Sequence, residues 1–274
     1  MKTWVGGRVV EAAEAYVSAH DHGLTVGDGV FETLKVVDGV PFALTRHLAR
    51  LRASADGLGL AAPPDAEVRA AVAELLSAHG VGEVGRLRIT VTGGVGPAGS
   101  ERGDAPPTLL VTVGPPTVWP VTADVVVVPW PRNERSAVAG LKTTSYAENV
   151  VALHEAKRQG AAEALFLDTQ GRLSEGTGSN VFVAWNGSLF TPSPASGCLA
   201  GITRGLVLEW TGAQEADLDR SVLAEADEVF LTSSTRDVQA VAHVDGRAVP
   251  AAPGPLTRAA ARAFAERSAA DVDP

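Results

Sequence analysis

A proline-rich segment near the middle of the chain constrains its fold more than any other feature of the sequence. The run consists of Gly114-Pro115-Pro116, followed closely by Trp119-Pro120. Each proline fixes its own φ and disfavours helix in the residue before it, so the run predicts a short, stiff connection near residue 118. With 274 residues, 45% of them hydrophobic, the chain can bury two cores. We therefore expect a smaller N-terminal α+β domain over 1–117 and a larger C-terminal domain over 118–274.

Strand and helix patterns alternate in the first part. Strand formers fill 30–37, and Asp38-Gly39 is a hairpin signal before the short apolar run 40–44. Thr45 is a candidate N-cap for a helix over 46–56, where apolar residues recur at helical spacing. The other elements expected here are one helix and two strands that flank a Gly/Pro-rich loop: 65–78, 86–92 and 108–113.

The second part combines strand and helix signals in the same way. The expected strands are 123–129, 163–168, 180–184, 188–191 and 228–232. The expected helices are 145–159, 203–211, 221–225 and 255–268. Both domains therefore mix helices and strands, which predicts an α+β fold class.

Composition excludes several classes of partner. The formal net charge of −9 and the pI near 5.2 argue against nucleic acid and anionic membranes, which need a dense basic patch. The single cysteine, Cys198, cannot form an intramolecular disulfide or a cysteine zinc site. Glycine and charge interrupt the first residues before a signal peptide could form, and runs such as 125–128 are too short to cross a bilayer. We expect a soluble, cytoplasmic protein without a metal.

One lysine stands out. The chain has four lysines, and Lys142 is followed by hydroxyl side chains at Thr143, Thr144, Ser145 and Tyr146, just before an expected helix. An amine that attacks a carbonyl needs a lowered pKa, which neighbours at such a position can provide. The alternative from these residues alone is an ordinary surface charge.

Three small polar segments could bind a flat or anionic ligand. Glycines after Glu175 would let a flat ligand approach the backbone. The helix start at Gly201-Ile202-Thr203-Arg204 would point amides at a phosphate. The turn Thr232-Ser233-Ser234-Thr235 offers hydroxyls and amides suited to an anion. Each segment could equally be a plain turn or helix cap.

The order of these segments carries more information than any of them alone. The motifs are Gly27-Asp28-Gly29-Val30-Phe31-Glu32-Thr33, His47-Leu48-Ala49-Arg50-Leu51, the segment around Lys142, Glu175-Gly176-Thr177-Gly178-Ser179-Asn180, Gly201-Ile202-Thr203 and Ser233-Ser234-Thr235. Together they resemble the class IV aminotransferase family, the fold type IV enzymes of pyridoxal 5′-phosphate. The resemblance covers nearly the whole chain. It implies two domains with the active site between them, at a homodimer interface.

The resemblance also implies roles for individual residues. Lys142 would be the catalytic residue, which binds the cofactor as a Schiff base and moves the proton between the substrate Cα and the cofactor C4′. This lysine is expected in the larger domain. Glu175 would pair with the pyridine nitrogen, and Arg50 would clamp the phosphate. Tyr146 resembles the tyrosine that hydrogen-bonds the cofactor O3′, although it lies one residue nearer the lysine. The remaining expected cofactor contacts are Ser179, Asn180, Ile202, Thr203, Ser233 and Ser234.

Substrate contacts follow from the resemblance less directly. Phe31 and Thr235 are expected beside the substrate, and Arg88 is the expected anchor of its carboxylate, with Arg236 as a second candidate. Arg88 could instead be an outward strand arginine. The loop 93–100 lacks the arginine and histidine that trap the carboxylate in the best-known D-amino-acid aminotransferases.

Two activities agree with these motifs. The first is transamination between a small amino acid, which could be D-configured, and a 2-keto acid by a ping-pong mechanism. The second is the aminodeoxychorismate lyase reaction, which releases pyruvate and gives 4-aminobenzoate for folate synthesis. A scaffold that has lost catalysis is disfavoured because Lys142, Glu175 and Arg50 are all present. We favour the transaminase.

Overall fold

The chain folds into two compact units, seen in a computed structural model that describes residues 1–274. Unit 1 comprises Met1–Thr117, Leu141–Tyr146 and Val272–Pro274, and unit 2 comprises Val118–Gly140 and Ala147–Asp271. The division after Thr117 falls within the proline-rich run. The segment with Lys142 belongs to unit 1, whereas we expected it in the second domain, because its backbone hydrogen-bonds to a strand of unit 1.

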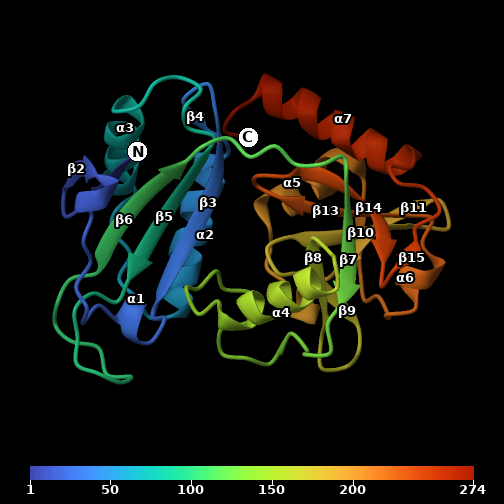
Figure 1. Cartoon of the computed structure of the whole chain (residues 1–274), viewed down its shortest axis with the longest axis horizontal. Helices are drawn as coiled ribbons and strands as arrows, with labels where there is room; N and C mark the ends of the chain where they lie inside the picture. The colour runs from blue at the N-terminus through green and yellow to red at the C-terminus, as the bar shows by residue number, and fades with distance from the viewer. The chain divides into compact units, whose positions relative to one another are not determined.

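Unit 1 is built on a six-stranded antiparallel sheet in the order β2-β1-β6-β5-β3-β4. The strands are β1 (Lys2–Val5), β2 (Arg8–Glu11), β3 (Gly29–Val37), β4 (Val40–Pro41), β5 (Arg86–Thr92) and β6 (Thr108–Gly114). A short helix, α1 (His22–Thr25), and a 3-10 turn, Ala12–Glu14, precede β3. Strands β3, β5 and β6 lie side by side in Figure 1.

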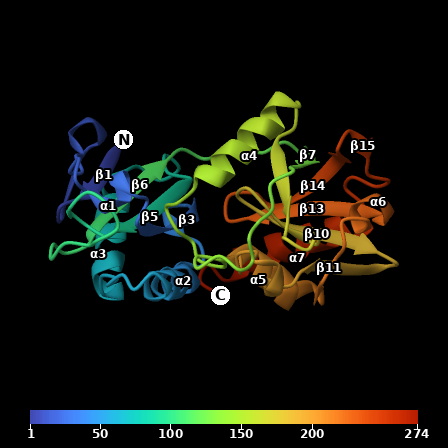
Figure 2. The ribbon, with the colours of Figure 1, turned by 90° about the horizontal axis from the view of Figure 1, so that it is seen from below.

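Helices α2 (Leu44–Gly57) and α3 (Asp65–Ser77) pack against this sheet. Both lie on the same side of it in Figure 2. Because successive strand side chains point to opposite faces, Leu34 and Leu87 meet Leu48 and Leu75 of the helices in a fully buried core. Phe31 takes the other face of β3, so one strand serves both the core and the site described below.

Unit 2 contains a nine-stranded mixed sheet in the order β12-β11-β10-β13-β14-β7-β8-β9, with β15 paired to β14. The strands are β7 (Thr122–Val127), β8 (Glu163–Leu167), β9 (Leu173–Gly176), β10 (Asn180–Trp185), β11 (Ser188–Pro192), β12 (Gln214–Ala216), β13 (Glu228–Ser233), β14 (Asp237–Val244) and β15 (Arg247–Ala248). The helices are α4 (Ala147–Arg158), α5 (Ile202–Thr211), α6 (Val222–Glu225) and α7 (Pro255–Ala270), and a 3-10 turn spans Pro194–Ser196.

The helices of unit 2 cover different parts of its sheet. Helix α4 connects the parallel strands β7 and β8, as a crossover between parallel neighbours requires. It packs on Phe166, while the adjacent Leu165 faces a second cluster with β10 and β13. Helices α5 and α7 pack on each other and on β13, near the stacked rings of Phe182 and Phe230, whose centroids are 4.8 Å apart.

The α+β fold class is confirmed, and every strand and helix expected from the sequence has a counterpart in the structure. Six strands were missed: β1, β2, β9, β12, β14 and β15. Thr45 is not the N-cap of α2, because the helix begins at Leu44 and Ala43 precedes it in the left-handed region. No helix has the combination of length and apolar composition that crossing a membrane requires.

Helix α2 obtains its N-terminal cap from a distant part of the chain. Ala43 offers no side-chain acceptor, but the Asp273 carboxylate accepts from the Thr45 backbone N–H at 2.8 Å and from the Thr45 hydroxyl at 2.5 Å. A carboxylate at this position satisfies an otherwise unpaired amide and interacts favourably with the helix dipole. Asp273 thus steadies the helix that carries His47, Arg50 and Ser54.

We expect Asp273→Ala to destabilise this helix end by about 1 kcal/mol, the usual cost of losing a capping side chain. Hydrogen exchange of the amides at 44–47 should accelerate, and urea unfolding should begin at lower concentration. Asp104→Ala, which removes an equal charge from an exposed loop position of the same unit, is the control. Equal exchange rates in both variants would contradict the assigned cap.

Candidate active site

The backbone around Lys142 forms an extra edge of the unit 1 sheet. Thr143 pairs antiparallel with Val30 of β3, and the Phe31 N–H donates to the Lys142 carbonyl at 3.0 Å. From α2, the Ser54 hydroxyl accepts from the Lys142 N–H at 3.1 Å. Lys142 is therefore held between a strand and a helix, and is not a loosely solvated surface lysine.

Small residues explain why the chain can approach β3 so closely. The Gly27 carbonyl accepts from the hydroxyls of Thr144 at 2.8 Å and Ser145 at 3.0 Å. A Cβ at Gly29 would lie 2.8 Å from the Val91 carbonyl oxygen and 3.1 Å from the Thr144 hydroxyl, so any side chain there would push the segment away. The Gly-Asp-Gly motif thus permits the contact that positions Lys142.

Three side chains gather around the ring of Phe31. The Lys142 Nζ lies 4.6 Å from the ring centroid and the Arg88 guanidinium lies 3.7 Å from it. Tyr146 meets the ring edge-on at a centroid distance of 5.3 Å. The structure therefore brings together Phe31, Arg88, Lys142 and Tyr146, all of which were expected at the site from the sequence.

Arg88 has no acidic partner. Its side chain is half-buried on β5, hydrogen-bonds the Thr90 hydroxyl at 3.2 Å, and lies within ion-pair distance of no carboxylate. Because the side chain is partly desolvated, the pKa of Arg88 lies below its usual value. Burying a guanidinium without an acidic partner costs free energy, and the carboxylate of a ligand would offset that cost by pairing with it.

Arg50, in contrast, pairs with a buried acid. Its Nε and Nη2 donate to the two carboxylate oxygens of Glu32 at 2.7 and 2.6 Å, and His47 Nδ1 contacts the same carboxylate at 2.6 Å. Burial raises the pKa of Glu32, but the charge and hydrogen bonds of Arg50 and the hydrogen bond of His47 outweigh it and bring the pKa to about 2. Burial also lowers the pKa of His47. The bidentate pair fixes the plane of the Arg50 guanidinium.

In unit 2, Glu175 lies one residue before the end of β9, with both carboxylate oxygens in defined contacts. Oε2 accepts from the Leu199 N–H at 2.9 Å, and Oε1 lies 3.2 Å from Nε of Arg132. The side chain is 12% exposed, so it can still meet a ligand. Sequence reasoning did not identify Arg132, nor the acid Glu32, as parts of the site.

Arg236 lies in a buried ion pair. Its Nη2 contacts Glu163 Oε2 at 2.6 Å, its guanidinium lies 4.3 Å from the Trp119 ring centroid, and its side chain is only 8% exposed. Burial lowers the pKa of Arg236 while the charge of Glu163 raises it. Glu163 also accepts from the Thr177 N–H at 3.0 Å and the Ser179 hydroxyl at 3.3 Å. The pair therefore braces the turn after Glu175, and Arg236 is less accessible than Arg88 to a substrate carboxylate.

The start of α5 has the features of an anion seat. Its N-cap residue, Gly201, offers no side-chain acceptor, and a Cβ there would collide with the Asn180 side-chain oxygen. The amides of Ile202 and Thr203 open the helix, where the helix dipole favours negative charge. Ser233 ends β13, Ser234 and Thr235 follow it, and all three are half-buried. The hydroxyl of the preceding Thr232 is buried without a partner.

The donors within each unit, taken by itself, are of the kinds that bind pyridoxal 5′-phosphate. Unit 1 supplies an amine at Lys142 and a fixed guanidinium at Arg50. Unit 2 supplies a carboxylate at Glu175 and an uncapped helix N-terminus at Ile202. An aldehyde, a ring nitrogen and a phosphate need donors of these kinds.

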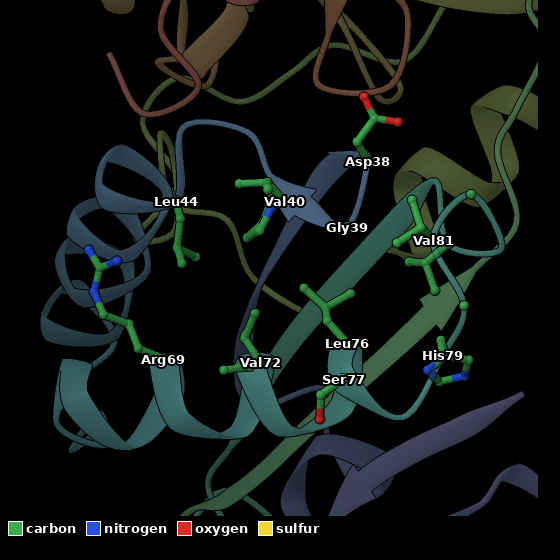
Figure 3. A pocket seen from close by; sticks show the side chains of 15 residues that line it. Asp38, Gly39, Val40, Leu44, Arg69, Val72, Leu76, Ser77, His79 and Val81 are labelled. Atoms are coloured by element: carbon green, nitrogen blue, oxygen red, sulfur yellow. The ribbon is translucent and has the colours of Figure 1, made fainter.

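Unit 1 also has a surface pocket that is separate from these residues. It has a volume of about 510 Å³ and lies between the β3–β4 hairpin, α3 and the turn after α3. Val72 and Leu76 of α3 line it together with Val40 and Leu44, as Figure 3 shows. None of the residues expected at the site from the sequence lines it.

Comparisons with known proteins identify the family. The profile of the amino-transferase class IV family matches residues 29–244. D-alanine aminotransferase of Bacillus licheniformis is 31% identical over 275 residues, covering 94% of each chain. Aminodeoxychorismate lyase of Bacillus subtilis is 29% identical over 247 residues, covering 86% of this chain and 84% of its own.

A solved structure agrees with both sequence relatives. The branched-chain aminotransferase of Thermoproteus uzoniensis superimposes with a TM-score of 0.90 at 29% identity, covering 97% of this chain and 94% of its own. The fold is thus that of the fold type IV enzymes, which use pyridoxal 5′-phosphate. The chain belongs to the class IV aminotransferase family.

Proposed function

We propose that this enzyme is a transaminase that moves an amino group between a small amino acid, D-configured substrates included, and a 2-keto acid by a ping-pong mechanism. The observation that carries the proposal is the pair of cations at Phe31: the Lys142 amine and the unpaired Arg88 guanidinium. An amine that reacts at a carbonyl and a cation that binds a carboxylate are what an amino-acid substrate requires.

Each residue would have one task. When bound, the cofactor supplies an electron sink for the carbon that loses its proton. Lys142 would bind the cofactor covalently and move that proton with its Nζ. Glu175 would face the pyridine nitrogen, while Arg50, Ile202, Thr203, Ser233 and Ser234 would hold the phosphate. Tyr146 would contact O3′, Ser179 and Asn180 would line the cofactor, and Thr235 would border the substrate.

The second candidate is the aminodeoxychorismate lyase reaction. It is supported by the named Bacillus subtilis relative and by the segments Gly27–Thr33 and Lys142–Asn149. Both reactions begin with removal of the same proton, so Lys142 and Glu175 serve either. They differ in the later steps, and a comparison of substrates separates them.

The decisive experiment follows the visible absorbance of the bound cofactor. D-alanine, L-alanine, D-glutamate, L-leucine and (R)-1-phenylethylamine are mixed separately with the enzyme, and we expect at least one amino acid to bleach the band by transferring its amino group. A keto acid should then restore it. Lys142→Ala, the control, should lack the band and lose several orders of magnitude in turnover. If no donor bleaches the band while aminodeoxychorismate yields 4-aminobenzoate, the lyase is the correct assignment.

Arg88→Met tests the carboxylate anchor. Loss of a charged hydrogen bond costs about 1.5–3 kcal/mol, so kcat/KM for amino and keto acids should fall roughly 10- to 150-fold. Arg86→Met, an exposed arginine two residues away on the same strand, is the matched control. Unchanged kcat/KM in Arg88→Met for every carboxylate substrate would refute the anchor.

We further propose a cytoplasmic homodimer. Apolar side chains remain exposed on α4, where Val150 is 63% and Val151 is 51% accessible, and Trp130 of the same unit is 44% accessible. Exposed apolar groups of this size favour burial against a second protein surface, and the single cysteine suits a reducing compartment. Light scattering should give twice the mass of one chain, and Val150→Asp/Val151→Asp should lower it. A monomeric mass for the unaltered enzyme would contradict the dimer.

A further inference from the structure

Arg132 forms an ion pair with Glu175. Its Nε lies 3.2 Å from Glu175 Oε1, and the two side chains are 15% and 12% exposed. This Nε is buried and makes no aligned hydrogen bond, so the contact is an ion pair rather than a linear N–H···O bond. Arg132 is not among the site residues that were expected from the sequence.

The structure holds Arg132 in place from several directions. Its backbone N–H donates to the Leu167 carbonyl at 2.7 Å, and its guanidinium lies 4.2 Å from the ring centroid of the buried Phe166. Both Nη atoms lie 3.3 Å from the Asn149 side-chain oxygen, and Nη1 lies 3.1 Å from a carboxylate oxygen of Glu148. A flat guanidinium stacked on a ring and bonded along its edge has little freedom to rotate.

The same network reaches the turn that follows Glu175. Asn149, which accepts from Arg132, donates from its amide nitrogen to the Thr177 carbonyl at 2.5 Å. On the other side of the carboxylate, the Leu199 N–H fixes Oε2. Glu175 is thus set between a backbone donor and a guanidinium, both of unit 2.

We propose that Arg132 is a positioning residue that orients the Glu175 carboxylate and favours its negative charge. The proposal rests on the proposed role of Glu175 toward the pyridine nitrogen. A carboxylate that stays charged stabilises a protonated ring nitrogen, whereas a carboxylate without Arg132 could rotate or take the proton itself. Arg132 would act only through Glu175, without touching the cofactor.

The test combines two single variants with their double variant. Arg132→Leu should lower kcat about 10- to 100-fold, the range seen when residues that orient metal ligands are removed, with little change in KM. The pH midpoint of the visible cofactor band should rise. A pyridine ring with less positive charge withdraws less electron density from the nitrogen that joins it to Lys142, so this nitrogen would keep its proton to a higher pH. In the Arg132→Leu/Glu175→Gln variant, kcat should be no lower than in Glu175→Gln alone, since the two residues act as one unit.

Controls separate this role from a purely structural one. Arg172→Leu removes an arginine of similar exposure, 18%, that pairs with Asp168 and Asp217 and not with Glu175, and it should leave the midpoint unchanged. Arg132→Lys should recover part of kcat, and Arg132→Gln substitutes for Arg132→Leu if the latter does not fold by circular dichroism.

Each alternative outcome has a distinct meaning. Losses in kcat that multiply in the double variant, or a midpoint that moves equally in Arg172→Leu, would overturn the role of Arg132 and leave that of Glu175 intact. A Glu175→Gln variant with unaltered turnover and midpoint would overturn the proposed role of Glu175, and the role of Arg132 with it.

Discussion

The pairing of the Lys142 segment with β3 is the constraint on which the arrangement of Phe31, Arg88, Lys142 and Tyr146 within unit 1 depends. Strand β4 pairs only with Val36 and Val37, so the backbone of β3 from Gly29 to Phe31 would remain an open edge, and open edges are a liability. The segment Leu141–Tyr146 covers that edge through Thr143 and Thr144. A shift of one residue in this register would turn the Lys142 side chain to the opposite face. The same backbone contacts therefore protect the edge of β3 and position the Lys142 amine.

Acidic partners distinguish the arginines of this protein from one another. Arg50, Arg132 and Arg236 each pair with a carboxylate of low exposure. A buried pair contributes little net stability, because desolvation offsets its attraction, but removing one member is costly. Such pairs fix geometry: Glu32 fixes the orientation of the Arg50 guanidinium, and Glu163 holds the turn that follows Glu175. Arg88 lacks such a partner, and this difference is why we propose that a ligand carboxylate binds Arg88 and not Arg236.

Local patterns predicted the elements that have strong periodicity, and long-range contacts explain what they missed. Strand β3 and helix α2 follow from alternation and helical spacing, whereas β1 and β2 are short strands, and β14 begins directly after the polar turn Ser233–Arg236. The buried acid that distinguishes Arg236 from Arg88 could not be recognised from sequence, because Glu163 lies 73 positions from Arg236. A signal for Glu32 was present: it alternates with Val30 and Leu34 on the core face, where a charged residue needs a partner such as Arg50.

Charge placement also explains how an acidic protein can select an anionic substrate. The net charge of −9 repels carboxylates at long range, but screening limits that field to about 8 Å at physiological salt. Within that distance Arg88 and Lys142 surround Phe31, and burial strengthens their attraction because the local dielectric is lower. Selectivity for small carboxylates would thus arise from a few desolvated cations at short range. Steering by the whole surface would favour cations instead, so a carboxylate would have to bind by direct contact. In the proposed function, the position of Arg88 relative to Lys142 would then limit the size of the substrate.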